Sequence, residues 1–238
     1  MNTEIIPLEH PITFESLGRP IPENHRFFDT PHTKLLIGPK RCGKTTYILN
    51  GLNKKELYNN HFWDIFVFSP NGDQFGKEVI SKQQNVYGSF SDEKLQVVKE
   101  KAIQNRDDGK IEGDKEPRET LLIIDDAMAS KCLRSGLFLQ LMSTHRNLNL
   151  TIWLSIQDLI ALDVRLRNLF DNFVIWRPNY SDLNCMIRLL ELPEWTKEDL
   201  NNLFKSQNTY NDRKDYLTFN KSRKEIIRNF LDYVIIKQ

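Results

Sequence analysis

The stretch LLIGPKRCGKTTYIL, residues 35–49, decides the fold. An apolar run stops at Gly38, a short turn carries Lys40 and Arg41, and a helical pattern begins at Lys44. Within it, GPKRCGKT matches the pattern G-x-x-x-x-G-K-[ST] of a phosphate-binding loop. A predicted strand precedes the match and a predicted helix follows it, which is the context that this motif requires. The stretch therefore predicts a P-loop in an α/β nucleotide-binding fold.

The composition of this turn fits phosphate chemistry. Gly38 and Gly43 let the backbone bend and approach the phosphates closely. The loop N–H groups can then form an anion-binding nest at a helix N-terminus, where the helix dipole also favours negative charge. We expect Lys44 to reach the β- and γ-phosphates of ATP and the Thr45 hydroxyl to ligate Mg²⁺. The predicted nucleotide-binding residues are Gly38, Pro39, Lys40, Arg41, Cys42, Gly43, Lys44, Thr45 and Thr46.

Three positions of the loop leave alternatives open. Lys40 and Arg41 face the nucleotide, a neighbouring subunit or water, with water as the default. Cys42 is interpreted as a tolerated small residue, although its oxidation would block the site. The chain has three cysteines, an odd number without metal-site spacing, which indicates reduced thiols in an intracellular compartment.

Two adjacent acids follow a second apolar strand, in the stretch LLIIDDA. Asp125 emerges at the carboxyl end of this strand, where α/β sheets bind their ligands. An acid there can hold Mg²⁺ in the manner of a Walker B element. Asp126 can orient or deprotonate the attacking water, which would make the protein a hydrolase. The alternative for each acid is a cap of the next helix.

A third strand, LTIWLSIQ, places Gln157 at its carboxyl end and Arg146 just before its start. The Gln157 amide can bond the γ-phosphate or the attacking water, unless it only begins a helix. Seven residues of strand, at about 3.3 Å each, separate Arg146 from its own γ-phosphate. Arg146 is therefore predicted to act on a neighbouring subunit as an arginine finger, with Arg165 and Arg167 as rivals and a plain surface arginine as the alternative.

The remaining chain alternates apolar strands with helical patterns, which indicates a mainly parallel sheet with helices on both faces. Its 238 residues, 27% charged and with net charge +1, suit one α/β domain with appendages. Uncharged runs stay below the roughly 18 residues of a membrane span, so no membrane partner is expected. Further strands are expected over residues 63–70, 172–178 and, at the sheet edge, 215–220; helices are expected over 92–105, 135–146, 164–170, 181–191 and from 222 onward.

The predicted organisation has three parts. Residues 1–33 form an extended arm, residues 34–190 form the ATPase core, and residues 191–238 form a helical extension packed on the core. Ser181 is expected to cap the helix over 181–191, with Asp182 in its first turn. Residues 105–119 are charged, contain two glycines and a proline, and are expected to form a solvated loop.

Together these motifs resemble the FtsK–HerA superfamily of P-loop ATPases, and more narrowly the poxvirus-type genome-packaging ATPases of large DNA viruses, virophages and Polinton-like elements. The resemblance covers residues 34–184 and includes THRNLNLTIWLSIQDL followed by RNLFDNFVIWRP. It implies ATP and Mg²⁺ as cofactors, Asp125 and Asp126 as the Walker B pair, Gln157 as sensor and Arg146 as finger. It also implies a homo-oligomeric ring, double-stranded DNA and a capsid or portal component as partners, in the host cytoplasm, a viral factory or the virion.

Three functions are compatible with these residues. The preferred one is an ATP-driven motor that moves double-stranded DNA into a capsid. A nucleoside or nucleotide kinase would need an arginine-rich lid, and residues 106–119 carry four basic residues against six acids. A P-loop switch without motor activity is disfavoured by the adjacent aspartates and Gln157.

Overall fold

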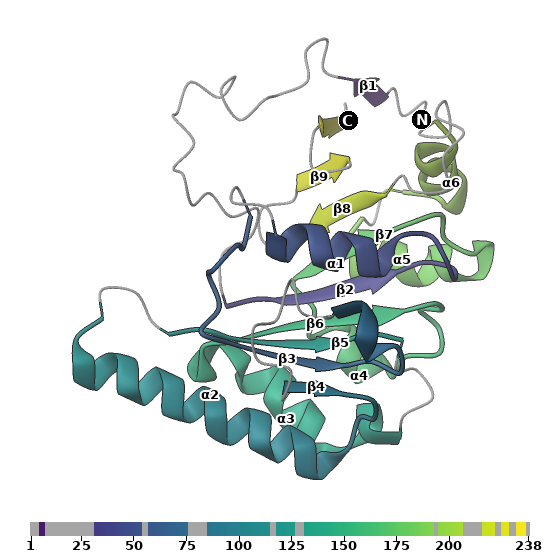
Figure 1. Ribbon diagram of the computed structural model, residues 1–238. Coiled ribbons are helices and arrows are strands. Elements are labelled where there is room, and N and C mark those ends of the chain that lie inside the picture. The colour runs from purple at the N-terminus through teal and green to yellow at the C-terminus, as the bar shows by residue number, and fades with distance from the viewer. Residues whose placement is uncertain are drawn as a thin grey trace.

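The strands of the protein pair side by side in a single sheet. The computed structural model describes residues 5–7, 31–53, 57–75, 85–114, 118–126, 131–192, 195–206, 216–221, 225–228 and 232–236. Within these residues the sheet has ten strands in the order β1-β10-β9-β8-β7-β2-β6-β5-β3-β4 (Figure 1). The strands are β1 Ile5–Pro7, β2 Thr33–Ile37, β3 Asp64–Phe68, β4 Val86–Tyr87, β5 Thr120–Ile124, β6 Leu150–Ile156, β7 Asn172–Ile175, β8 Leu217–Asn220, β9 Glu225–Arg228 and β10 Asp232–Ile236.

The sheet is parallel from β7 through β2, β6, β5 and β3 to β4. The strands β8, β9, β10 and β1 extend it on the far side of β7, and each pairs antiparallel to its neighbours. The helices are α1 Lys44–Asn53, α2 Asp92–Glu112, α3 Gly136–Thr144, α4 Val164–Arg167, α5 Leu183–Leu189 and α6 Lys197–Ser206. The α/β class with a mainly parallel sheet, predicted from the sequence, is confirmed.

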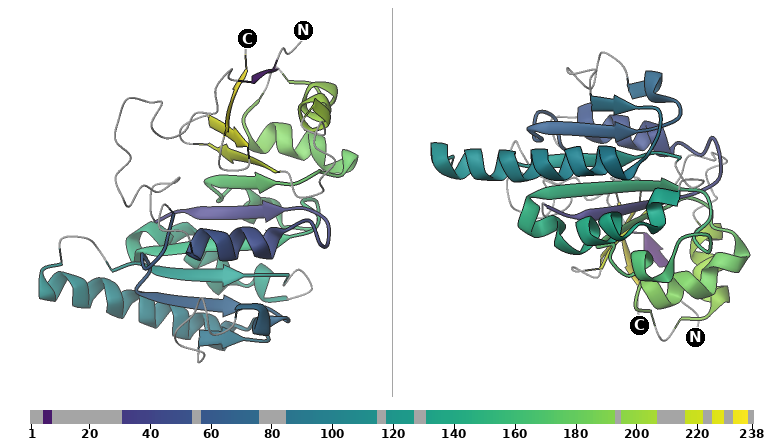
Figure 2. Two further views of the ribbon diagram at one scale, coloured as in Figure 1. Left: turned by 45° about the horizontal axis from the view of Figure 1, so that its top comes forward. Right: turned by 90° about the horizontal axis from the view of Figure 1, so that it is seen from below.

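Helices cover both faces of the sheet because the strands are apolar on both sides. In β2, Leu35 and Ile37 face a core that α2, α3, α5 and α6 complete. Leu36 faces the other way, into a second core that Tyr47 and Ile48 of α1 complete. Figure 2 shows α1 on one side of the sheet and the remaining helices on the other. The carboxyl ends of the parallel strands all lie along one side of the sheet, the carboxyl edge, and α1 begins at this carboxyl edge.

Helix α2 is much longer than its sequence pattern predicts. The prediction of a solvated loop over 105–119 is wrong for residues 105–112, which belong to this helix. The helix begins after Ser91, whose hydroxyl accepts from the Lys94 N–H, and ends at Gly113 in the left-handed region at φ 71°. Buried Asn105 donates to Asp64 of β3 and to Thr120 of β5, so tertiary bonds hold the polar part of the helix against the sheet.

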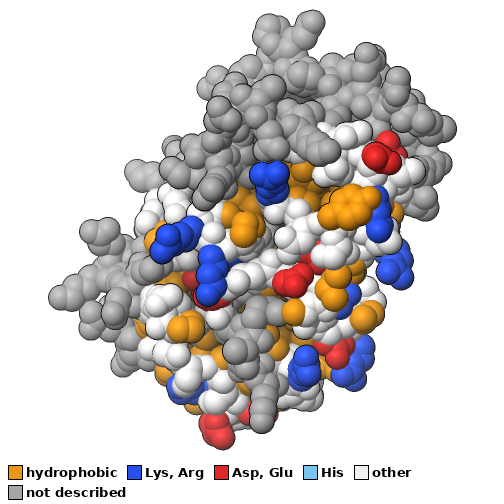
Figure 3. Space-filling view, turned by 90° about the vertical axis from the view of Figure 1, so that its right-hand side faces the viewer, with side chains coloured by type: hydrophobic (Ala, Val, Ile, Leu, Met, Phe, Trp, Pro, Cys, Tyr) orange, Lys and Arg blue, Asp and Glu red, His pale blue; other side chains and the backbone are white. Residues whose placement is uncertain are grey.

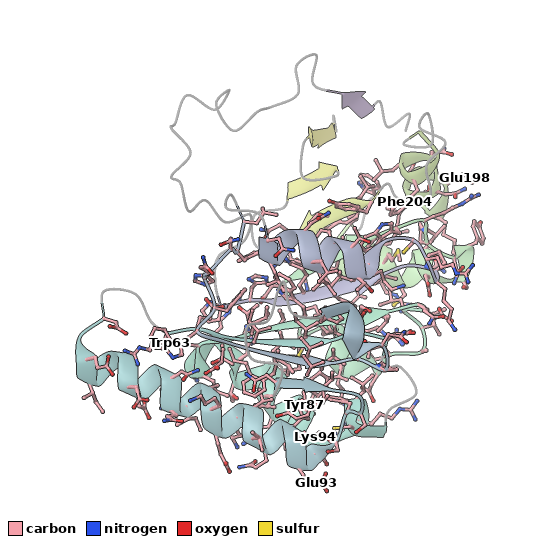
Figure 4. All side chains as sticks on the ribbon, viewed as in Figure 1. Trp63, Tyr87, Glu93, Lys94, Glu198 and Phe204 are labelled. Atoms are coloured by element: carbon pink, nitrogen blue, oxygen red, sulfur yellow. The ribbon has the colours of Figure 1, made fainter. Side chains whose placement is uncertain are left out.

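Side chains at both ends of α2 also anchor it. At its start the Lys94 ammonium lies 5.2 Å from the ring centroid of Tyr87 in β4, and these two residues are neighbours in Figure 4. Beyond its end the Arg118 guanidinium lies 4.0 Å from the ring centroid of Trp63, which stands at the opposite end of the sheet in Figure 4. Arg118 also bonds Glu112 in the last turn of the helix.

The C-terminal region is a sheet extension, and the amphipathic helix predicted from Ser222 is wrong. Residues 225–228 and 232–236 are strands β9 and β10, and β9 pairs with β8 along its whole length. The strand over 215–220 is therefore not an edge strand, because β8 lies between β7 and β9. A strand edge with free N–H and C=O groups attracts the following segment into extended pairing, which helical periodicity does not reveal. The predicted arm over 1–33 lies largely outside the described residues.

The cap predicted for the helix over 181–191 is also wrong. Residues Tyr180–Asp182 form a 3₁₀ turn, and α5 begins only at Leu183. Asp182 is buried, and its carboxylate accepts from the Ile160 N–H in the loop after β6 at 3.3 Å instead of capping α5. Burial, followed by the nearby Asp158 carboxylate, raises the pKa of Asp182 above its usual value.

Candidate functional site

The loop between β2 and α1 wraps back on itself at the carboxyl edge of the sheet. The Gly38 N–H donates to the Ile156 carbonyl of β6 at 3.2 Å, and the Tyr47 N–H donates to the Gly43 carbonyl at 2.8 Å. Gly43 lies at φ 105°, a conformation that side chains strongly disfavour, and Arg41 lies in the left-handed region at φ 64°. The backbone therefore has the tight bend that the glycine spacing predicts.

Gly38 is required by close packing. A Cβ atom at this position would lie 2.8 Å from the Cys42 sulfur and 2.8 Å from Cβ of Trp176. Cys42 is buried, and this burial raises the pKa of its thiol although the Lys44 charge opposes the shift. The thiol therefore stays protonated and weakly nucleophilic, which fits the interpretation of Cys42 as a small packing residue.

Replacing Gly38 with alanine is expected to deform the loop or separate it from Trp176. Overpacking of this kind costs about 1–3 kcal/mol, and we expect this loss in the free energy of unfolding together with weaker nucleotide binding. Denaturant unfolding and nucleotide titration measure the two effects. Gly136→Ala is the matched control, because a Cβ there meets no atom within 4 Å. Equal stability and affinity in both variants would contradict the close-packing argument.

A cation and a hydroxyl occupy the mouth of the loop. The Lys44 ammonium donates to the Gly38 carbonyl at 2.6 Å and to the Pro39 carbonyl at 2.9 Å, so it lies inside the curve of the loop. The Thr45 hydroxyl donates to Oδ2 of Asp125 at 2.9 Å. Asp125 directly follows β5 and is only 5% exposed. The residues predicted to bind phosphate and metal thus come together.

Asp126 and Gln157 form the second polar pair of this edge. The Gln157 amide Nε2 donates to Oδ1 of Asp126 at 2.7 Å. Asp126 has φ 55°, a left-handed conformation that Asp and Asn adopt more readily than other side chains. Its N–H donates to the Ser155 hydroxyl at 3.2 Å, and this hydroxyl in turn bonds Asp125. The two Walker B candidates and Gln157 are therefore joined by one network.

Ser155 was not predicted from the sequence, although a signal was present. It is the polar residue two positions before Gln157 in an apolar strand, so both side chains lie on the same face of β6. The register of β5 and β6 pairs Ile124 with Leu154, which places Asp125 beside Ser155.

Most of the P-loop, the two Walker B candidates and Gln157 line one pocket of about 740 Å³. Figure 3 views this side of the molecule, where basic, acidic and hydrophobic side chains lie interspersed. The predicted residues in its lining are Lys40, Arg41, Gly43, Lys44, Thr45, Thr46, Asp125, Asp126 and Gln157. Five further lining residues were missed, namely Tyr47, Asn50, Asn71, Trp176 and Tyr216. Most of them lie outside any local motif and reach the pocket through the fold.

Arg146 lies at the opposite edge of the sheet. It belongs to the 3₁₀ turn His145–Leu148, which precedes β6, whereas Gln157 follows β6. Its side chain is 66% exposed and pairs with Oδ1 of Asp171 at 2.8 Å. Burial alone would raise the pKa of Asp171, but the His145 ring, the Thr33 N–H and the charge of Arg146 outweigh it and hold the pKa well below its usual value. Asp171 therefore remains a carboxylate that can orient Arg146.

The two rival arginines differ in their freedom to act. Arg167 donates to the carbonyls of Leu162 and Ile160, so its guanidinium holds the loop after β6 together. Arg165 is 70% exposed, and within the described residues its guanidinium pairs with the nearby Asp163. Arg165 thus remains the stronger rival of Arg146.

Comparison with known proteins gives a family and a fold. The model of the poxvirus A32 protein family matches residues 23–227. The genome packaging NTPase B204 from Sulfolobus turreted icosahedral virus 2, in complex with ATP-gammaS, is similar in structure with TM-score 0.56 and 16% identity, over 84% of this chain and 98% of that one. Its sulfate complex gives TM-score 0.57 and 17% identity, over 84% and 96%.

A more distant likeness extends to a secretion ATPase. The cytoplasmic domain of the type VII secretion ATPase EccC of Thermomonospora curvata matches with TM-score 0.50 and 12% identity, over 87% of this chain and 24% of that one. Curated proteins gave no match. At these identities the structural likenesses establish the P-loop ATPase fold.

Two negative findings concern the described part of the chain. No helix there is long and apolar enough to cross a membrane. No three His, Cys, Asp or Glu side chains gather there as a metal cluster. Because the A32 family model spans most of the chain, this protein belongs to the poxvirus A32 protein family and is a genome-packaging ATPase.

Proposed function

We propose that this protein is the ATP-hydrolysing motor that moves double-stranded DNA into a viral capsid, and that it works as a homo-oligomeric ring. The observation that carries the proposal is the network at the carboxyl edge of the sheet. There Thr45 bonds Asp125 and Gln157 bonds Asp126, beside the Lys44 ammonium, in one pocket of about 740 Å³. A passive binder of phosphate needs the loop alone, whereas this arrangement also supplies an acid and an amide for water.

The P-loop would hold the triphosphate of ATP. Backbone N–H groups from Lys40 to Thr46 would surround the phosphate oxygens, and the N-terminus of α1 favours their negative charge. The Lys44 ammonium would leave its two loop carbonyls for the β- and γ-phosphate oxygens. Lys40 and Arg41 are exposed and line the pocket, so they are placed to add charge at its rim.

The same edge suits a magnesium ion. Mg²⁺ prefers oxygen ligands and is held in such enzymes by one or two protein groups together with substrate phosphates. The Thr45 hydroxyl and the Asp125 carboxylate, 2.9 Å apart, are oxygen donors that fit this requirement. We propose that they hold the ion, which would neutralise charge on the transferring phosphoryl group. The Ser155 hydroxyl would fix the second oxygen of Asp125.

Asp126 and Gln157 would prepare the attacking water. Asp126 is the group that can accept its proton, and the Gln157 amide holds Asp126 in place at 2.7 Å. Gln157 directly follows β6 and lines the pocket, so the same amide would also sense the γ-phosphate.

Replacing Asp126 with asparagine is expected to preserve ATP binding and to reduce its hydrolysis by about 10²–10⁴-fold, the usual contribution of a general base. Asparagine tolerates the left-handed backbone at φ 55°, so the variant changes charge without adding strain. Single-turnover hydrolysis and nucleotide titration separate the two effects. Normal hydrolysis by Asp126→Asn would reduce Asp126 to a structural role.

We further propose that Arg146 completes the site of a neighbouring subunit. It lies a full strand length, about 23 Å at about 3.3 Å per residue, from the edge that binds nucleotide in its own chain. Because its side chain is 66% exposed, a partner subunit could contact it. Asp171 would orient the guanidinium until the ring assembles. Catalysis would therefore depend on ring assembly.

The proposed partners are double-stranded DNA and a capsid or portal component, in the host cytoplasm, a viral factory or the virion. A motor grips DNA mainly through its phosphates and without regard to sequence. Several subunits would share those contacts, which agrees with the formal net charge of only +1 on each chain.

Measuring ATP turnover with and without linear double-stranded DNA tests this function. The motor predicts strong stimulation by DNA of any sequence. Transfer of the γ-phosphate to a nucleoside would instead indicate a kinase, and slow turnover indifferent to DNA would indicate a switch. The structure weakens the kinase alternative, because Arg106 and Arg118 of the charged segment are held in ion pairs with Asp107, Glu112 and Asp114.

A further inference from the structure

The nucleotide pocket has an aromatic side that the phosphate-binding motifs do not use. Beyond the P-loop and the Walker B candidates, its lining includes Tyr47, Asn50, Trp176 and Tyr216. Phosphates and metal need none of these side chains. They form an aromatic wall with an amide beside it, next to the helix that begins at Lys44.

The fold brings this wall to the nucleotide edge. Strand β7 runs parallel to β2 and ends at that edge, whereas β8 runs antiparallel and begins there. The register pairs Ile175 with Leu217, so the next pair beyond the ladder is Trp176 with Tyr216. Both side chains share the face of the sheet on which α1 packs, because residues alternate along a strand.

Within this wall, Tyr216 is the ring that can offer a surface to a ligand. Its centroid lies 5.0 Å from that of Trp176 and 5.2 Å from that of Tyr47. Trp176 is 1% exposed and Tyr47 is 3% exposed, so both serve as its backing. Tyr216 itself is partly exposed and borders the pocket. Because Trp176 and Tyr47 pack against it, the Tyr216 ring is held in place before a ligand binds and can serve as a surface on which a base stacks.

Asn50 supplies a polar group beside this surface. It is exposed, lines the pocket, and lies one helical turn after Thr46 on α1. An asparagine amide carries both donors and an acceptor, and it matches the donor and acceptor edge of adenine.

We propose that Tyr216 and Asn50 form the nucleobase subsite, in which the base of the nucleotide stacks on Tyr216 and the Asn50 amide bonds the adenine edge. This inference rests on the proposed function, since it requires that the P-loop binds the triphosphate of the same ligand. It assigns binding and base selectivity to residues that come from α1 and from the start of β8.

Calorimetric titration with two probes, ATP and inorganic tripolyphosphate, tests the subsite, because only ATP carries a base. Tyr216→Ala is expected to weaken ATP binding by about 5- to 150-fold, the range for a base stacked on one aromatic ring. The same variant is expected to bind tripolyphosphate as the wild type does. Tyr216→Phe is expected to restore ATP affinity, since the ring is kept. The wild type is expected to bind ATP more tightly than GTP, and Asn50→Ala is expected to lose this preference.

Three results would overturn the subsite. Unchanged ATP affinity in Tyr216→Ala would place the base elsewhere. Equal weakening of ATP and tripolyphosphate would show that Tyr216 only supports the loop. A wild type that binds neither probe would contradict the P-loop assignment itself, and the subsite with it, whereas the first two results leave the proposed function standing.

Discussion

Replacing Lys44 with alanine is expected to lower ATP hydrolysis by about 10²–10³-fold or more while the fold survives. The ammonium lies inside the curve of the loop, where it can follow charge as it develops on the transferring phosphoryl group. Its bonds go to the Gly38 and Pro39 carbonyls at the mouth of the loop, so its removal takes nothing from the two hydrophobic cores. Steady-state turnover and thermal unfolding, measured together, test both parts of this expectation.

Lys110→Ala is the matched control for this variant. Lys110 is exposed in the last turn of α2, away from the pocket. Its replacement is expected to leave turnover unchanged. Normal turnover in Lys44→Ala would remove the central role of the P-loop, and a loss in both variants would point to a general defect.

Replacing Arg146 with alanine is expected to leave ATP binding intact and to lower hydrolysis by about 10³–10⁵-fold, the measured worth of an arginine finger. The reason is geometric: the residue lies at the wrong edge of the sheet for its own nucleotide, and its side chain is 66% exposed, so a neighbouring subunit could contact it. Activity per chain is also expected to rise with protein concentration, because assembly creates the complete site. Arg188→Ala, which changes another exposed arginine, serves as the control.

Mixing Arg146→Ala chains with Lys44→Ala chains tests action between subunits. A Lys44→Ala subunit can still lend Arg146 to a partner whose P-loop is intact, so some activity is expected to return. Absence of rescue at every mixing ratio, with mixed assemblies confirmed by mass, would contradict the assignment and direct attention to Arg165. Arg167 is the weaker replacement, since two carbonyls of its own chain hold it.

The sequence predicted the parts of the site that depend on local order. The P-loop, Asp125, Asp126 and Gln157 each lie at a strand end, and parallel strands end at one edge of a sheet. Their spacing along the chain was therefore enough to predict that they meet, and the bonds of Asp125 with Thr45 and of Asp126 with Gln157 confirm their proximity. The roles assigned to them in catalysis remain predictions.

What the sequence did not predict depends on contacts between distant segments. The length of α2 follows from Asn105, which bonds Asp64 and Thr120, and no periodicity of apolar residues reports such bonds. The segments of β9 and β10 were predicted as helix from their local pattern. In the structure they are strands, because pairing with the sheet edge offered by β8 outweighs that pattern. Tyr216 reaches the pocket only through the antiparallel register of β7 and β8.

The most direct test of the motor is displacement of a third strand from DNA. A triplex-forming oligonucleotide is bound to one end of a linear duplex, and its release is followed after the assembled protein and ATP are added. We expect release that requires hydrolysable ATP, is independent of duplex sequence, and is lost in Lys44→Ala. A wild-type protein that hydrolyses ATP on the duplex yet never releases the third strand would contradict the claim that this ATPase moves along DNA.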